Sequence, residues 1–146
     1  MIVREAQNQD LQQLLTLYTH LHNNPMPQID KRIKNLWKEI IETPEHHIIV
    51  GNIDDEIISS CVVIIVPNLT HDQRPYALIE NVITHPGHRG KGYALAVLEY
   101  AKKLAIDNRC YKIMLMSSAK NESTLKFYEE AGYNMNDKTA FVQWLE

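Results

Sequence analysis

Residues 76–104 read YALIENVITHPGHRGKGYALAVLEYAKKL, and the order of patterns in this stretch decides the fold. Residues 76–84 form an apolar run of strand length that stops at His85-Pro86-Gly87. A basic turn with two glycines follows, and apolar residues then recur at helical spacing from Ala94 to Ala105. A turn of this kind at the start of a helix suits an anion, because free N–H groups and the helix dipole both favour negative charge. The stretch therefore predicts a pyrophosphate site.

The flanking patterns predict a central sheet with helices, of the α+β or mixed α/β class. Strands are expected at residues 2–5, 47–50, 57–66, 76–84, 111–116 and 141–145. Helices are expected from Leu11 to about His22, from a cap at Asp30 to Thr43, after the glycine turn, and over residues 121–130. The run 57–66 is nearly continuously apolar, which places it at the centre of the sheet. A helix between strands 76–84 and 111–116 implies a right-handed crossover and parallel pairing of those two strands.

Composition limits the class of protein. The chain has 146 residues, of which 45% are hydrophobic and 23% charged, with a net charge of −3. These values predict one globular domain over residues 1–146, with neither a nucleic-acid partner nor a membrane partner. The first residues contain no apolar core of a signal peptide, so a cytoplasmic location is expected. Cys61 and Cys110 are expected as free buried thiols, and the seven histidines show no metal-ligand spacing, so we predict no metal site.

Three glycine motifs compete for the turn, and two of them fail on residues. A P-loop has Lys followed by Ser or Thr after its last glycine, whereas Tyr93 and Ala94 follow Gly92 here. A dinucleotide fingerprint has a third glycine where this chain has Leu95. The pattern [QR]-x-x-G-x-[GA] is satisfied in full by residues 89–94, RGKGYA.

Two segments of the chain resemble the acetyl-CoA-binding half of the GNAT N-acetyltransferases, and together they lie within residues 76–133. The first is 82–94, VITHPGHRGKGYA, which is similar to the strand–Pro–RGxGxA signature of that family. The second is 121–133, NESTLKFYEEAGY, which looks like the helix N-x-x-A-x-x-F-Y-E-x-x-G-[FY] of the family, with Thr124 at the usual small residue. The first 75 residues match only in the order of elements.

The resemblance implies the GNAT fold, with a mixed, mostly antiparallel sheet and helices on both faces. Strands 76–84 and 111–116 would splay apart, and the pantetheine arm of acetyl-CoA would lie between them. The backbone of residues 82–84 would pair with that arm, and Thr84 stands where the family usually has Val. Cofactor contacts are expected from Val82, Ile83, Thr84, His88, Arg89, Gly90, Lys91, Gly92, Tyr93, Ala94, Asn121 and Ser123.

Glu80 is the candidate general base. An amine arrives protonated and must lose a proton before it can attack a thioester. An ionisable residue inside an apolar strand is costly unless it is paired or used, and the period of two places Glu80 on the same face as Val82 and Thr84. The alternative is a strand-edge carboxylate paired with Arg or Lys. Asn81, on the other face, is a weaker candidate for substrate binding.

Tyr128 is the candidate general acid. The resemblance assigns to it the tyrosine that protonates the leaving thiolate. It lies seven residues after Asn121, two helical turns along the same face. The alternative is that Phe127 and Tyr128 are core residues of an amphipathic helix, and a tyrosine can pack its ring while its hydroxyl acts. Asn121 would bind the pantetheine, cap the helix, or do both.

The function implied is transfer of acetyl from acetyl-CoA to a primary amine of a small molecule or peptide, by direct attack in a ternary complex. A non-catalytic acyl-CoA-binding or sensor protein is the alternative. Residues 110–113 and 121–128 also resemble amino-sugar-phosphate acetyltransferases, but they lie mostly in the cofactor half. The first two helices and residues 67–75 are expected to shape the acceptor pocket. The acceptor amine and a homodimer are left open.

Overall fold

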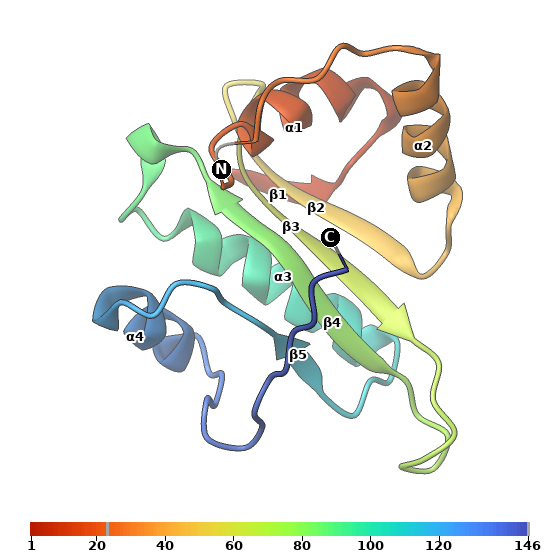
Figure 1. Ribbon diagram of the computed structural model, residues 1–146, viewed down its shortest axis with the longest axis vertical. Coiled ribbons are helices and arrows are strands. Elements are labelled where there is room, and N and C mark those ends of the chain that lie inside the picture. Colours follow the sequence, from red (N-terminus) through yellow and green to blue (C-terminus); the bar gives the residue numbers. More distant parts are fainter. Residues whose placement is uncertain (23, 146) are drawn as a thin grey trace. The chain divides into compact units, whose positions relative to one another are not determined.

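The computed structural model describes residues 1–22 and 24–145, and these form two compact units (Figure 1). The first unit runs from Met1 to Leu115 and the second begins at Met116. The elements of the first unit are β1 (Ile2–Glu5), η1 (Asn8–Asp10), α1 (Leu11–Tyr18), α2 (Lys31–Glu42), β2 (His46–Ile53), β3 (Glu56–Val66), β4 (Tyr76–Thr84), η2 (Pro86–His88), α3 (Tyr93–Asp107) and β5 (Ile113–Leu115). The second unit contains α4 (Glu122–Glu130). The expectation of one domain over 1–146 stays a prediction.

The five strands form one sheet in the order β1-β2-β3-β4-β5, with three antiparallel pairs and a parallel β4–β5 pair. The predicted mixed, mostly antiparallel sheet is therefore confirmed, as is the parallel pairing after the α3 crossover. β3 lies in the middle of the sheet, and its residues from Ile57 to Val63 are all buried. The strand predicted at 111–116 is shorter than expected, with only Ile113–Leu115 in the ladder.

Helices cover both faces of the sheet (Figure 1). On one face, α1 and α2 pack Leu14, Leu17 and Trp37 against a cluster of sheet residues that includes Val62 and Ile83. On the other face lies α3, whose Val97 carbonyl is 3.7 Å from the Sγ of Cys61. We call these the α1/α2 face and the α3 face. The predicted burial of Cys61 is confirmed, and burial raises the pKa of its thiol to about 12, while Cys110 is free and only half-buried.

A bulge in β4 changes which residues share a face. Ser60 lies opposite Ile83 and Val62 lies opposite Glu80, so two steps along β3 match three steps along β4. The extra residue is accommodated at Asn81, which is exposed and has a φ of +51°. Glu80 is therefore on the α1/α2 face with Ile83, while Thr84 is opposite Ser59 on the α3 face. The prediction that Glu80 shares a face with Val82 and Thr84 was wrong, because a strict period of two does not survive an inserted residue.

The ends of α1 and α2 can be compared with the boundaries predicted from the sequence. Asp30 caps α2 as predicted, since its Oδ1 accepts from Ile33 N at 2.9 Å, and Thr43 ends that helix. The first helix was expected to reach His22 but ends at Tyr18. Its continuation tightens into i to i+3 turns, such as Leu21 N to Tyr18 O at 2.9 Å, and a left-handed His22 with a φ of +54° closes it.

The second unit contains α4 and the chain that follows it. Gly132 has a φ of +91° one residue after the C-cap, as the helix end predicted. The strand predicted at 141–145 was wrong, because the structure has no strand in this segment. Phe141 is 91% exposed and Trp144 is 86% exposed. An alternating apolar pattern favours a strand, but a strand forms only where a neighbouring strand is there to pair with it.

No helix in the part of the chain that the structure covers has the length and apolar character required to cross a membrane.

Candidate active site

The second half of β4 has an open edge. Only Ala77 to Ile79 pair with β5, through contacts such as Ala77 N to Lys112 O at 3.0 Å. From Glu80 to Thr84, no strand of the described chain lies on that side of β4. We call Glu80–Thr84 the open edge. An unpaired strand edge offers N–H and C=O groups that an extended ligand can pair with, as a further strand would.

The direction of the backbone groups along the open edge follows from the ladder with β3. His85 N donates to Ile58 O at 2.8 Å, so His85 faces β3. Backbone groups alternate in direction along a strand, so Ile83 also faces β3 while Thr84 and Val82 face away from it. Of the three residues predicted to contact the cofactor through their backbone, Val82 and Thr84 therefore have groups directed to the open edge, and Ile83 does not.

The glycine turn follows directly and leaves the start of α3 open. Gly90 and Gly92 have φ values of +73° and +80°, which glycine adopts without strain. A Cβ at either position would meet nothing within 4 Å, so no described side chain crowds these two glycines. Gly92 is the N-cap of α3 and provides no side-chain cap, whereas Asp30 caps α2. The first N–H groups of α3 are therefore directed outward, as an anion site requires.

The basic residues of the turn brace its backbone. Arg89 Nε donates to Thr84 O at 3.2 Å, and Lys91 Nζ donates to Gly87 O at 3.2 Å. Arg89 thus joins the turn to the end of the open edge. The ring of His88 lies 6.1 Å from that of Tyr93, and its Nδ1 is buried without a hydrogen-bond partner among the described residues.

Glu80 is half-buried on the α1/α2 face, one residue before the bulge. Its carboxylate makes no hydrogen bond or ion pair with any residue that the structure describes. The alternative of a structural carboxylate paired with Arg or Lys therefore finds no partner here. The α3 face of β4 is filled by α3, so the α1/α2 face is the side on which a second substrate can meet Glu80.

The remaining predicted residues belong to the second unit. Asn121 caps α4, since its Oδ1 accepts from Thr124 N at 2.9 Å and from Ser123 Oγ at 2.7 Å. The capping role predicted for Asn121 is thus present, and Ser123 supports it. The ring of Tyr128 is half-buried and packs edge-on against Phe127, with ring centroids 5.1 Å apart, and against Tyr133 at 6.1 Å.

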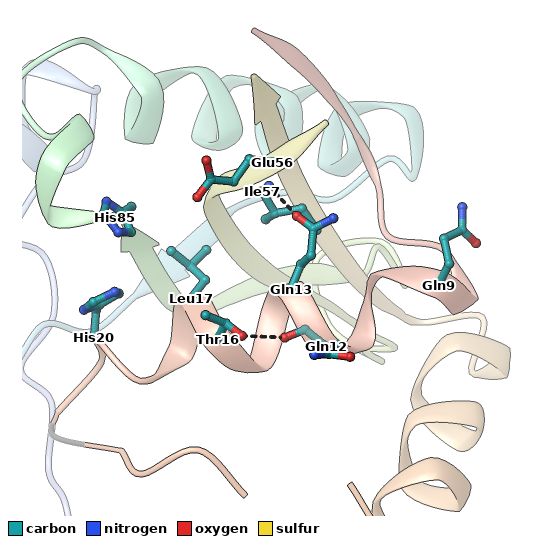
Figure 2. A pocket seen from close by; sticks show the side chains of 9 residues that line it. All are labelled: Gln9, Gln12, Gln13, Thr16, Leu17, His20, Glu56, Ile57 and His85. Atoms are coloured by element: carbon teal, nitrogen blue, oxygen red, sulfur yellow. Dashed lines mark hydrogen bonds between the residues drawn. The ribbon is translucent and has the colours of Figure 1, made fainter. Parts of the chain in front are cut away.

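A shallow cleft of about 380 Å³ runs along α1 (Figure 2). Polar residues of that helix line it, and His20 and His85 face each other at one end with ring centroids 4.8 Å apart. Gln13 and Ile57 also line it, and Gln13 Oε1 accepts a hydrogen bond from Ile57 N at 2.9 Å. The cleft includes none of the predicted site residues and no residue of α2 or 67–75, so it gives no outline of the expected acceptor pocket.

Metal ligands do not cluster in the described residues 1–22 and 24–145, where no three His, Cys, Asp or Glu side chains could hold an ion together.

One residue beside the site was missed at the level of sequence. Ser59 of β3 is fully buried, and its Oγ lies 3.1 Å from Ile83 O and 2.9 Å from Thr84 Oγ1. It is 25 residues away from Thr84 in the chain, so no local motif connects the two. The only sign in the sequence is a pair of serines inside an otherwise apolar strand.

Comparisons with known proteins agree with this architecture. The model of the acetyltransferase (GNAT) family matches residues 5–133. A solved structure from Agrobacterium tumefaciens str. C58, provisionally named an acetyltransferase, is 30% identical with a TM-score of 0.91, covering 99% of this chain and 100% of its own.

Curated relatives match over shorter stretches. Glucosamine 6-phosphate N-acetyltransferase of Trypanosoma brucei brucei is 32% identical over 82 residues, which are 56% of this chain and 54% of the relative. Streptothricin acetyltransferase of Escherichia coli is 32% identical over 66 residues, 45% of this chain and 38% of the relative. The matches thus span about half the length of these relatives or less. The family match covers most of the chain, and the protein belongs to the GNAT acetyltransferase family.

Proposed function

We propose that the protein is an acetyl-CoA-dependent N-acetyltransferase that acts on a primary amine. The observation that carries the proposal is the open edge of β4, which leads directly into an uncapped helix start in a chain of the GNAT family. An extended, amide-rich arm with a pyrophosphate at one end matches both features. The arm would pair with the strand and the pyrophosphate would lie on the N–H groups of the turn.

The predicted contacts divide between backbone and side chains. Val82 and Thr84 would pair with the pantetheine arm, because their groups face the open edge. The N–H groups of the turn and of the start of α3 would bind the pyrophosphate, and Arg89 and Lys91 would add positive charge beside it. Asn121 would bind the arm through its amide nitrogen while its oxygen caps α4.

The chemistry needs a base and an acid. Glu80 would accept a proton from the ammonium group of the acceptor, directly or through water, and the free amine would then attack the thioester carbonyl. The tetrahedral oxyanion needs an N–H donor, and the Val82 N–H beside the bulge would supply one. Collapse breaks the C–S bond, and Tyr128 would give its proton to the departing thiolate. The second proton of the nitrogen would then return to Tyr128, directly or through water, as the amide forms. Both substrates are bound together throughout, so no acetyl-enzyme forms.

The acceptor class is proposed from the relatives. One relative is named for glucosamine 6-phosphate and another for streptothricin, both hydroxylated amines. The chain carries a net charge of −3, so its overall charge does not favour a strongly anionic acceptor. Small hydroxylated amines are therefore the first acceptors to test, with simple amines and peptide N-termini beside them.

Release of free thiol from acetyl-CoA with this panel of amines tests the proposal. We expect turnover with at least one amine, and a loss of about a hundredfold or more in kcat for Tyr128→Phe. Tyr100→Phe, on α3, is the matched control and should keep the wild-type rate. Binding of acetyl-CoA without transfer to any amine would contradict the enzymatic function and favour the non-catalytic alternative.

A further inference from the structure

Two neighbouring serines of β3 differ in their surroundings although both are fully buried. Ser59 and Ser60 each have 0% exposure. Ser59 Oγ contacts Ile83 O and Thr84 Oγ1, whereas Ser60 Oγ has no partner of hydrogen-bond geometry in the described chain. Ser60 lies near Tyr18: burial raises the pKa of Tyr18 to about 12, and Ser60 offsets a smaller part of that rise. A buried hydroxyl costs free energy unless it is bonded, so Ser59 and Ser60 do different things.

The direction of the hydrogen bonds around Ser59 is fixed by chemistry. A carbonyl oxygen can only accept, so at 3.1 Å the Ser59 hydroxyl donates to Ile83 O. A hydroxyl has one proton, so at 2.9 Å the Thr84 hydroxyl must donate to Ser59 Oγ. The chain of donors runs from Thr84 to Ser59 to the Ile83 carbonyl, and it lies on the α3 face beside the last residues of the open edge.

This series of hydrogen bonds sets the direction of one N–H group, that of Thr84. The peptide bond between Ile83 and Thr84 is trans, so its C=O and N–H point in opposite directions. Ser59 holds the Ile83 carbonyl toward β3, and the Thr84 N–H is thereby directed to the open edge. Ile83 pairs with Ser60 where the ladder resumes beyond the bulge, and the bond from Ser59 adds a second constraint on its carbonyl.

The next peptide is held in the same way from both ends. His85 N donates to Ile58 O at 2.8 Å, and Thr84 O accepts from Arg89 Nε at 3.2 Å. Of the groups of Thr84, the carbonyl and the hydroxyl are thus engaged within the protein. Its N–H remains as the donor offered at the open edge.

We infer that Ser59 is a positioning residue that aims the Thr84 N–H at the amide-rich arm of acetyl-CoA. The inference rests on the proposed function, because it assigns the ligand of the open edge to that cosubstrate. Ser59 itself does not touch the cosubstrate, since it is buried on the α3 face. Its effect should therefore fall on acetyl-CoA affinity and not on recognition of the amine.

The test compares Ser59→Ala with Ser60→Ala, two changes of the same size at adjacent buried positions. We expect Ser59→Ala to raise the acetyl-CoA Kd and KM about five- to tenfold, with the KM for the amine unchanged. Ser60→Ala removes a hydroxyl without a partner and should leave both constants as in the wild type. Calorimetry gives Kd and thiol release gives both KM values, at a temperature well below the unfolding midpoints of all variants.

A double variant adds a check on the donor chain. In Ser59→Ala/Thr84→Val neither hydroxyl remains, so no buried hydroxyl is left unpaired and the unfolding midpoint should recover relative to Ser59→Ala. The acetyl-CoA Kd should stay raised, because the Ile83 carbonyl still lacks the hydrogen bond from Ser59. If Ser59→Ala yields no folded protein, Ser59→Cys keeps the volume, weakens the donor and carries the same expectation.

The outcomes separate the two proposals. Unchanged acetyl-CoA Kd in Ser59→Ala, with only a lower unfolding midpoint, would overturn the inference and leave the proposed function standing. Equal losses in Ser59→Ala and Ser60→Ala would also overturn it, since packing alone would then explain both. Absence of acetyl-CoA binding by the wild-type protein would remove the proposed function, and the inference with it.

Discussion

The two halves of β4 share one strand but have different surroundings. Tyr76–Ile79 lies between β3 and β5, with Ala77 and Ile79 buried under α3. Glu80–Thr84 pairs with β3 alone, contains the bulge and keeps one edge open. The backbone N–H and C=O groups of the first half bond to neighbouring strands on both sides. In the second half, the groups directed away from β3 are left for a ligand.

A binding site can therefore be formed where one part of a strand has no neighbouring strand on one side. Pairing on both sides holds Tyr76–Ile79 in place, and the open edge is held because it continues the same strand. Its outward N–H and C=O groups stay available for hydrogen bonds. A change at Glu80, whose side chain lies outside the core cluster, should therefore alter activity and leave stability nearly constant. Changes in the paired half should do the reverse.

Glu80→Gln should give the largest effect. It keeps the size of the side chain and removes the carboxylate, so we expect kcat/KM to fall by about a hundredfold or more if Glu80 is the base. The free energy of unfolding should change by less than about 0.5 kcal/mol, because Glu80 makes no described ion pair. Glu99→Gln, an exposed position on α3, is the control in the same thiol-release assay. Full activity of Glu80→Gln would place the base elsewhere.

Ile79→Ala tests the paired half. Ile79 is 1% exposed, and truncation should lower the free energy of unfolding by about 2–5 kcal/mol. Acetyl-CoA affinity, measured where the variant is fully folded, should stay within about twofold of the wild type. Ile106→Ala, at a position 64% exposed on α3, should change stability by less than about 0.5 kcal/mol in the same denaturant titration. A large loss of affinity in Ile79→Ala would show that the two halves are not separable.

Asp10→Asn should give the smallest effect, a modest loss of stability. Asp10 lies at the start of α1, outside the candidate site. Burial alone would raise the pKa of Asp10, but hydrogen bonds from Arg4 at 3.0 Å and from Gln7 N at 2.7 Å, with the Arg4 charge, outweigh it and lower the pKa. A lowered pKa stabilises the fold above the ordinary carboxyl pKa of about 4, and this contribution is lost as the pH falls through the lower folded value.

The variant should therefore be less stable at pH 7, on the order of 1 kcal/mol, and the gap to the wild type should close toward pH 2. Denaturant midpoints across this range measure it. A gap that is constant with pH would contradict the assignment of the lowered pKa to Asp10.

Much of this architecture could be predicted from the sequence, because the signals are local. The apolar run 76–84, the turn residues Gly90 and Gly92 and the cap Asp30 each act on their immediate neighbours, and the structure has the same elements there. The segments that resemble the GNAT family extend this to the mixed, mostly antiparallel sheet and its parallel pair.

The features that could not be predicted depend on partners far away in the chain. An inserted residue at Asn81 leaves the composition of β4 unchanged, and the tolerance of Asn for left-handed backbone is its only sign. The bonds of Ser59 cross to another strand. Phe141 and Trp144 follow a strand-like pattern, but the structure has no strand at these residues.

Amide hydrogen exchange followed residue by residue by NMR, with and without acetyl-CoA, tests the central claim most directly. We expect the Thr84 N–H to gain protection when acetyl-CoA binds. The Ile83 N–H, directed to β3, and the Ile79 N–H, directed to β5, are already protected and should change little. Binding of acetyl-CoA with no added protection at Thr84 would contradict the open edge as its binding site.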